Sequence, residues 1–251
     1  MPYTENQGIR IHYKTEGVGA PLVLQHGFTD SLESWYEMGY VEALKNDYRL
    51  IVVDARGHGG SDKPHDPTAY THEIHVADLV AVLDDLTIPT AHFLGYSMGG
   101  RIGFALATYA SARFSSLIIG GANPYQRNRE QFDARLQALQ RGPDSIVALW
   151  DGVVSPALRA RLLANDGEAM AASWLGRMRG PGLEDVLPTM RMPCLLFVGE
   201  ADGAYAGVKE CVQHMPNVTF VSLPDLKHSE TFFRSDLVLP HVLKFLASAS
   251  H

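Results

Sequence analysis

The chain has 251 residues, of which 46% are hydrophobic and 20% are charged, and its formal net charge at pH 7 is −7. This composition is typical of a globular protein that buries a core without disulfide bonds. The acidic balance, with no basic face, argues against nucleic acids and anionic membranes as partners. The sequence has no run of about 18 apolar residues that could cross a membrane.

The two cysteines, Cys194 and Cys211, are too few for a disulfide framework, and they favour a reducing compartment. Residues 1–6 lack the basic and apolar regions of a signal peptide. We therefore expect a cytoplasmic protein.

Strand and helix patterns alternate from the N-terminus. Residues 9–14 alternate apolar and polar side chains, which predicts one strand of a hairpin. Residues 21–25 and 50–54 are continuous apolar runs, typical of strands covered on both faces, with a helix expected between them over 35–46. The later predicted segments are helix 70–86, strand 92–95, helix 97–109, strand 116–119, strand 194–198, a further helix, strand 218–221 and helix 237–249. This alternation predicts an α/β fold with a mostly parallel sheet flanked by helices.

Residues 124–190 interrupt the alternation. They show no strand pattern, are rich in Arg, Leu, Ala and Met, and are broken by several prolines and glycines. We expect a small helical cap inserted into a core domain formed by residues 1–123 and 191–251. An insertion at the carboxyl edge of a parallel sheet lies where ligands bind. Trp150 and Trp174 of this segment either line a substrate pocket or form the core of the cap.

The pattern G-x-S-x-G occurs as Gly95-Tyr96-Ser97-Met98-Gly99. It follows a predicted strand and opens a predicted helix, which is the setting of a nucleophile elbow. Glycines on both sides leave room for the sharp turn that exposes the serine. The alternative is an ordinary strand-to-helix turn with a serine N-cap. The context favours Ser97 as a catalytic nucleophile.

A serine hydroxyl needs a general base, which in this architecture follows the serine and an acid along the chain. His228 lies after the last predicted strand and before the final helix, where such a base is expected. Asp202, Glu200 and Asp225 are candidates for the acid that orients it. We favour Asp202, because it lies a few residues past a strand, on a loop that can reach His228 Nδ1.

Acyl transfer places negative charge on the carbonyl oxygen of the substrate, and backbone N–H groups stabilise it. One donor is expected from the residue after the nucleophile, Met98. The other is expected from the loop after the first apolar run, where His26-Gly27 precedes Phe28. The sequence therefore predicts the N–H groups of Phe28 and Met98 as the oxyanion hole.

Together these motifs resemble the α/β-hydrolase superfamily over nearly the whole chain. The stretch from Asp54 to Ser61 is similar to the D-x-R-G-x-G-x-S loop of that superfamily, which is mainly structural there. Residues 56–100 look most like small esterases and 3-oxoadipate enol-lactonases. The resemblance implies a serine hydrolase that cleaves a small-molecule ester or lactone through an acyl-serine intermediate. It implies no metal and no organic cofactor.

Several alternatives stay open within this resemblance. Haloalkane dehalogenases and epoxide hydrolases carry an aspartate where Ser97 stands, and C–C hydrolases often carry a tryptophan where Ser229 follows the histidine. A lactonase, a C–C hydrolase or a perhydrolase could use the same three residues. A ligand-binding protein without turnover would not need a complete triad. His72 and His75, with His65 and Asp66 nearby, suggest a metal site only weakly, and we expect a solvated helix start there.

Overall fold

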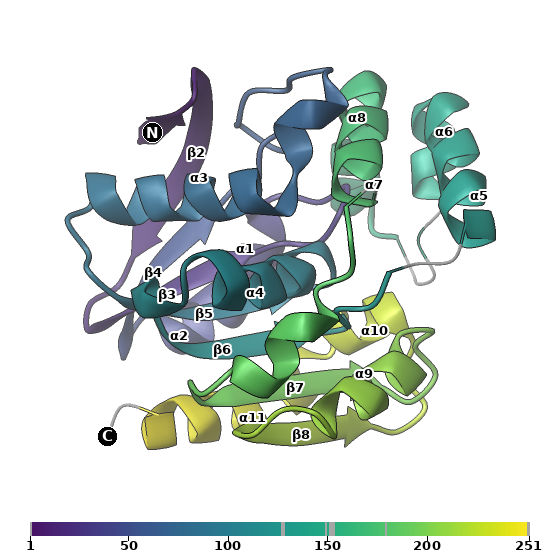
Figure 1. The fold of residues 1–251 in the computed structure, drawn as a ribbon. Coiled ribbons are helices and arrows are strands. Elements are labelled where there is room, and N and C mark those ends of the chain that lie inside the picture. The colour runs from purple at the N-terminus through teal and green to yellow at the C-terminus, as the bar shows by residue number, and fades with distance from the viewer. Residues whose placement is uncertain (1, 127–128, 149, 151–153, 179, 250–251) are drawn as a thin grey trace.

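The computed structural model describes residues 2–126, 129–148, 150, 154–178 and 180–249 (Figure 1). Its centre is an eight-stranded sheet with the order β1-β2-β4-β3-β5-β6-β7-β8. The strands are β1 (Tyr3–Asn6), β2 (Ile9–Glu16), β3 (Ala20–Gln25), β4 (Tyr48–Val53), β5 (Ala91–Tyr96), β6 (Phe114–Gly120), β7 (Cys194–Gly199) and β8 (Val218–Leu223). β2 pairs antiparallel with both β1 and β4, and all other pairs are parallel. The predicted α/β fold with a mostly parallel sheet is confirmed.

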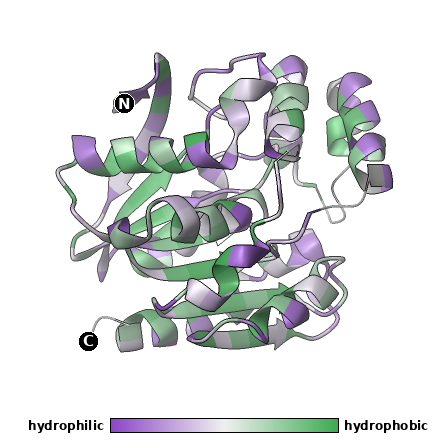
Figure 2. Cartoon of the chain, in the orientation of Figure 1, coloured by the Kyte–Doolittle hydropathy of each residue, from purple (hydrophilic) through white to green (hydrophobic). Residues whose placement is uncertain are grey.

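Helices cover both faces of this sheet. The helices are α1 (Glu33–Glu37), α2 (Tyr40–Leu44), α3 (His72–Asp85), α4 (Met98–Tyr109), α5 (Arg129–Gln140), α6 (Pro143–Val147), α7 (Pro156–Leu163), α8 (Gly167–Met178), α9 (Tyr205–Val212), α10 (His228–Phe233) and α11 (Ser235–Ala249), with short 3₁₀ turns η1 (Pro67–Tyr70), η2 (Ser111–Arg113) and η3 (Glu184–Thr189). Figure 2 shows the central strands as hydrophobic and the hydrophilic residues mostly on the surrounding helices.

Neighbouring residues of one strand point into two separate cores. On β5, Phe93 belongs to the cluster that includes side chains of α3, α4 and α9, while Leu94 belongs to the cluster that includes side chains of α1, α2 and α11. Both side chains are completely buried. Because neither face of the central strands meets water, their sequences read as continuous apolar runs rather than as alternating ones.

One predicted helix is wrong in detail. Instead of a single helix over residues 35–46, the chain forms α1 and α2, separated at Gly39, whose φ of 78° lies in the left-handed region and ends a right-handed helix. Trp35 of α1 and Tyr40 of α2 both pack against the ring of Phe232, with centroids 5.1 Å and 5.3 Å away. The break lets both aromatic residues bury themselves against one partner.

Helices α5 to α8 form the cap, which stands beside the sheet in Figure 1. The cap has a hydrophobic cluster separate from the two sheet cores, formed by Leu139, Ile146, Leu158, Leu162, Met170 and Trp174. Leu183, Val186 and Leu187, near η3, pack with a sheet core instead, so the cap's own cluster ends before η3.

In the described part of the chain, no helix combines the length and the apolarity that a membrane span requires.

Candidate active site

Ser97 occupies the turn between β5 and α4, with φ 55° and ψ −104°. Non-glycine residues adopt a positive φ rarely and at a cost, so this conformation is held by its surroundings. A Cβ atom on Gly95 would lie 2.4 Å from the backbone of Gly99, and one on Gly99 would lie 2.1 Å from Gln25 O. Only glycine fits at these two positions, which explains the pattern around the serine.

The structure brings together the three predicted residues Ser97, His228 and Asp202. Ser97 Oγ lies 2.8 Å from His228 Nε2, and His228 Nδ1 lies 2.7 Å from Asp202 Oδ2. An ionised carboxylate only accepts hydrogen bonds, so Nδ1 carries the proton and Nε2 is left to accept from the serine hydroxyl. The contacts join three segments that are far apart in the sequence.

The two other acid candidates do not contact His228. Glu200 accepts a hydrogen bond from Ser222 Oγ at 2.9 Å and is exposed. Asp225 is also exposed and occupies a turn with a φ of 58°. Asp202, in contrast, has a side chain that is only 3% exposed, and its Oδ1 accepts from the Ala204 N–H at 2.8 Å.

The loop between β3 and α1, residues 26–32, runs beside the serine. A Cβ atom on Gly27 would lie 3.5 Å from Ser97 Cβ. Among the hydrogen bonds of the described residues, the N–H groups of Phe28 and Met98 have no acceptor. Two unpaired N–H groups next to the serine are the arrangement that an oxyanion hole requires.

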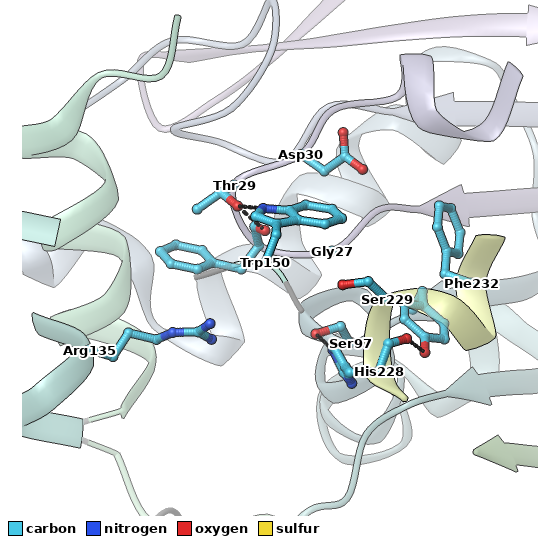
Figure 3. A pocket seen from close by; sticks show the side chains of 11 residues that line it. Gly27, Thr29, Asp30, Ser97, Arg135, Trp150, His228, Ser229 and Phe232 are labelled. Carbon is cyan, nitrogen blue, oxygen red and sulfur yellow. Dashed lines mark hydrogen bonds between the residues drawn. The ribbon is translucent and has the colours of Figure 1, made fainter. Parts of the chain in front are cut away.

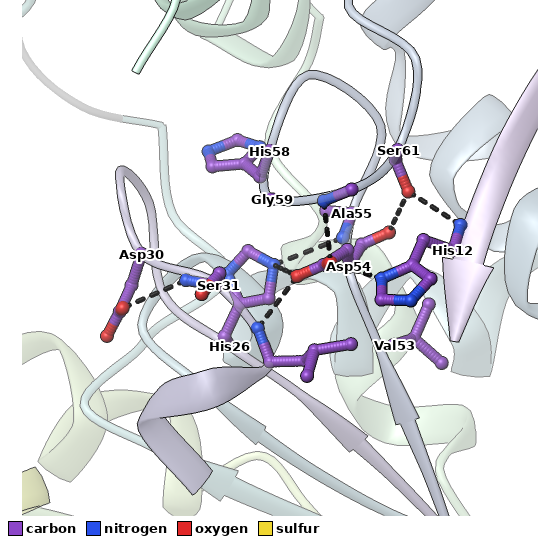
Figure 4. Close-up of polar contacts among 12 residues, drawn as sticks. His12, His26, Asp30, Ser31, Val53, Asp54, Ala55, His58, Gly59 and Ser61 are labelled. Carbon is purple, nitrogen blue, oxygen red and sulfur yellow. Dashed lines mark hydrogen bonds and ion pairs between the residues drawn. The ribbon is translucent and has the colours of Figure 1, made fainter. Parts of the chain in front are cut away.

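The direction of the Phe28 N–H is set by its own peptide group. His26 Nδ1 donates to Gly27 O at 2.7 Å, and Asp30 N–H donates to the same oxygen at 3.3 Å. The Ala55 N–H donates to His26 Nε2 at 3.1 Å, which fixes the tautomer of His26 (Figure 4). In a trans peptide the C=O and N–H point in opposite directions, so holding Gly27 O aims the Phe28 N–H.

Asp54 ties the same loop to the core (Figure 4). Its Oδ1 accepts from the Leu32 N–H at 2.8 Å, and its Oδ2 lies 2.7 Å from His12 Nδ1 and 2.8 Å from the Gly60 N–H. Burial raises the pKa of the Asp54 carboxyl, but the hydrogen bond with His12 and the other donors outweigh it and lower that pKa overall. Asp54 and Ala55 therefore support the loop next to the serine.

A pocket opens above Ser97 (Figure 3). It is lined by Gly27, Phe28, Thr29, Asp30, Tyr96, Ser97, Arg135, Trp150, His228, Ser229 and Phe232. Sequence reasoning did not select Arg135, Tyr96 or Phe232. Tyr96 could have been found from its place inside the G-x-S-x-G pattern, and Phe232 from its closeness to His228. Arg135 gave no signal, because it reaches the pocket only through the folding of the cap.

The two predicted cap tryptophans lie in different places. Trp150 lines the pocket, donates from Nε1 to Thr29 Oγ1 at 3.2 Å, and stacks on Phe233. Trp174 is not among the lining residues. It is 2% exposed within the cap cluster and donates from Nε1 to Phe132 O at 3.1 Å. Of the two roles considered for these residues, Trp150 has the pocket position and Trp174 the core position.

Truncating Trp150 should change substrate preference, whereas truncating Trp174 should lower stability. Trp150→Ala should change the relative kcat/KM for acetate, butyrate and octanoate esters by about 1–3 kcal/mol, because it removes a pocket wall. Trp174→Ala should lower the free energy of unfolding by about 3–5 kcal/mol, because it empties part of a core. Kinetics and thermal melts on both variants test this pair. The assignment would be reversed if Trp174→Ala alone shifted the preference.

His72 and His75 do not form the solvated helix start that we expected. They are 7% and 2% exposed, and His58 is completely buried. In the described ranges, no group of three or more His, Cys, Asp or Glu could hold a metal ion. Burial, with smaller effects of the positive charges on Arg101 and Arg177, lowers the pKa of His72 to about 3. Burial is also the main cause that lowers the pKa values of His75 and His58 well below the ordinary 6.5.

These histidines should make the fold sensitive to acid. Below pH 6.5 these histidines are protonated in the unfolded chain but stay neutral in the folded chain. The free energy of unfolding therefore falls as the pH drops towards their lowered pKa values. Each histidine contributes up to about 1.4 kcal/mol per pH unit. Urea unfolding between about pH 7.5 and 4.5 should show a shallower decline for His72→Gln than for wild type. Replacement of the exposed His214 by Gln is the control, and equal slopes for wild type and His72→Gln would contradict the prediction.

A serine at the strand–turn–helix of a mostly parallel sheet, followed by an acid and a histidine after later strands, is the arrangement of α/β hydrolases. A sequence model of the alpha/beta hydrolase fold family matches residues 20–193, more than half of the chain. The chain therefore belongs to the α/β hydrolase fold family.

Individual relatives differ in the activity that their names give. The chain is 28% identical to a putative 2-succinyl-6-hydroxy-2,4-cyclohexadiene-1-carboxylate synthase of Bacillus subtilis, over 98% of this chain and 97% of the relative. It is 26% identical to the enol-lactonase structure from Burkholderia xenovorans, with a TM-score of 0.87 and coverage of 98% and 100%. It is 25% identical to a thermophilic esterase structure from Thermogutta terrifontis, with a TM-score of 0.86 and coverage of 98% and 97%. The predicted resemblance to α/β hydrolases, esterases and enol-lactonases is confirmed.

Proposed function

We propose that the chain is a serine hydrolase that cleaves small carboxylic esters through an acyl-serine intermediate. The observation that carries this proposal is the continuous chain of contacts from Ser97 Oγ to His228 Nε2, at 2.8 Å, and from His228 Nδ1 to Asp202 Oδ2, at 2.7 Å, at the base of the pocket. The esterase and enol-lactonase among the similar structures support hydrolysis of an acyl–oxygen bond.

In this proposal Ser97 Oγ attacks the ester carbonyl carbon while His228 Nε2 takes the hydroxyl proton. The N–H groups of Phe28 and Met98 hold the oxyanion, and Asp202 stabilises the imidazolium that forms. His228 then returns the proton to the leaving alcohol, which departs and leaves Ser97 acylated. Water, deprotonated by His228, attacks the acyl group, and the acid leaves as Ser97 regains its proton.

The test is turnover by the purified chain of p-nitrophenyl esters and of lactones of graded size. Hydrolysis of the small esters, with a burst of p-nitrophenol equal to the enzyme concentration, would support an acyl-serine. Turnover of lactones alone would indicate a lactonase instead. Turnover only in the presence of hydrogen peroxide, as the acceptor of the acyl group in place of water, would indicate a perhydrolase. A chain that binds these compounds without converting any of them would be a ligand-binding protein, and the proposal would be wrong.

A second candidate function is hydrolysis of a lactone or ester that also carries a carboxylate. Arg135 of α5 lines the pocket, and Figure 3 shows its guanidinium directed towards the space above Ser97. A guanidinium binds a carboxylate through paired hydrogen bonds. The test compares p-nitrophenyl butyrate with the p-nitrophenyl ester of succinate for wild type and Arg135→Gln. A preference for the succinate ester that this substitution abolishes would favour the second candidate.

A further inference from the structure

The cap makes directed contacts with two consecutive residues of the 26–32 loop. Asn165, between α7 and α8, donates from Nδ2 to Thr29 O at 2.8 Å, and Trp150 donates from Nε1 to Thr29 Oγ1 at 3.2 Å. Arg161 of α7 forms an ion pair with Asp30 at 3.4 Å. The Asp30 side chain is only 4% exposed, so this ion pair is screened little by solvent. The loop is thus held on the cap side as well as on the core side.

Thr29 needs such support because of its backbone. Its φ is 69°, in the left-handed region, which is unfavourable for a β-branched residue. Its hydroxyl donates to Phe28 O at 2.6 Å while accepting from Trp150. Trp150 and Asn165 therefore fix the carbonyl on each side of this strained residue, that of Phe28 through the hydroxyl and that of Thr29 directly.

The cap also holds the side chain of Phe28. The Trp174 ring lies 5.7 Å from the Phe28 ring, centroid to centroid, and Arg177 Cζ lies 4.7 Å from the Phe28 centroid. Phe28 is thus enclosed by α8 on its ring side and fixed through Thr29 on its backbone side. Relaxation of Thr29 towards a negative φ would rotate the Phe28–Thr29 peptide. The resulting shift of Phe28 Cα would then turn the adjoining Gly27–Phe28 peptide, which carries the Phe28 N–H, away from Ser97.

We propose that Asn165 and Trp150 are positioning residues that hold the Phe28 N–H where it stabilises the oxyanion, so that the oxyanion hole is complete only when the cap is docked on the core. This inference rests on the proposed hydrolase function. It assigns to the cap a part in the chemical step itself, in addition to forming the pocket wall.

The first test is Asn165→Ala, assayed with a p-nitrophenyl ester well below its melting temperature. The oxyanion forms only in the transition state, so kcat should fall about 10- to 100-fold while KM stays within about threefold. Trp150→Phe keeps an aromatic ring in the pocket wall and removes the Nε1–H donor to Thr29. It should also lower kcat with little change in KM, but by a smaller factor than Asn165→Ala. The matched control is Arg159→Ala on α7, the helix that precedes Asn165, because the Arg159 side chain pairs, among the described residues, only with the exposed Asp144 at 3.4 Å.

A second variant separates positioning from loss of stability. Serine keeps the hydroxyl that joins Trp150 to Phe28 O and lacks the β-branch that makes a positive φ unfavourable, so Thr29→Ser introduced into Asn165→Ala should raise kcat by about two- to fivefold without restoring the lost hydrogen bond. A wild-type kcat in Asn165→Ala, an equal loss in Arg159→Ala, or no recovery in the double variant would overturn the inference. Failure of the proposed function is distinguishable, because the wild type itself would then hydrolyse no ester and Ser97 would take no fluorophosphonate label.

Discussion

Ser97→Ala is expected to lower the turnover of a p-nitrophenyl ester by about 10⁶-fold, the scale measured when a triad serine is removed. The reason is that Ser97 Oγ is the hydroxyl in contact with His228 Nε2, at 2.8 Å. Alanine at this turn meets no more crowding than serine does, so the melting temperature should change little. Ser222→Ala is the control, because its hydroxyl bonds to Glu200 on the surface and not to the triad.

Covalent labelling tests the same residue without relying on substrate choice. A fluorophosphonate should attach to Ser97 in the wild type and to no residue in Ser97→Ala, as mass spectrometry of the digested protein would show. Ser229 also lines the pocket, next to His228. Labelling of Ser229, or esterase activity that survives in Ser97→Ala, would show that the nucleophile is assigned wrongly.

The fold and the position of the serine were predictable because they depend on local patterns. Continuous apolar runs identified strands such as β4, predicted from residues 50–54, of which residues 50–53 are buried on both faces. The glycines around Ser97 follow from steric contacts within the turn and with Gln25, so they are visible in the sequence as a motif. His228 was accessible through chain order alone, since it follows the last strand of the sheet.

Other features depend on contacts between distant segments. The positive φ of Thr29 is supported by Trp150 and Asn165, which lie 121 and 136 residues further along the chain. No local pattern reveals that support. Likewise, α3 begins with polar residues, so nothing in the sequence around His72 indicates that its side chain is buried. Long-range packing therefore decides which residues of the cap meet the pocket, and the sequence alone left Trp150 and Trp174 equivalent.

Asp202→Asn is expected to lower kcat by about 10⁴-fold while leaving the protein folded. The carboxylate accepts the proton of His228 Nδ1 at 2.7 Å, which keeps Nε2 free to take the serine proton. An asparagine amide can present an N–H to Nδ1 instead, and this favours the tautomer in which Nε2 is already protonated and cannot act as a base. Since asparagine has the same size and can still accept from the Ala204 N–H, the loop after β7 should keep its shape.

The alternative acids supply matched controls for this prediction. Asp225→Asn and Glu200→Gln make the same chemical change, but both residues are exposed and neither contacts His228. Their kcat values should therefore stay within about threefold of wild type, in the range expected for surface substitutions. Steady-state kinetics on all three variants, with thermal melts beside them, give the comparison. A large loss in Asp225→Asn together with a mild one in Asp202→Asn would mean that the loop after β8, rather than the loop after β7, supplies the acid during turnover.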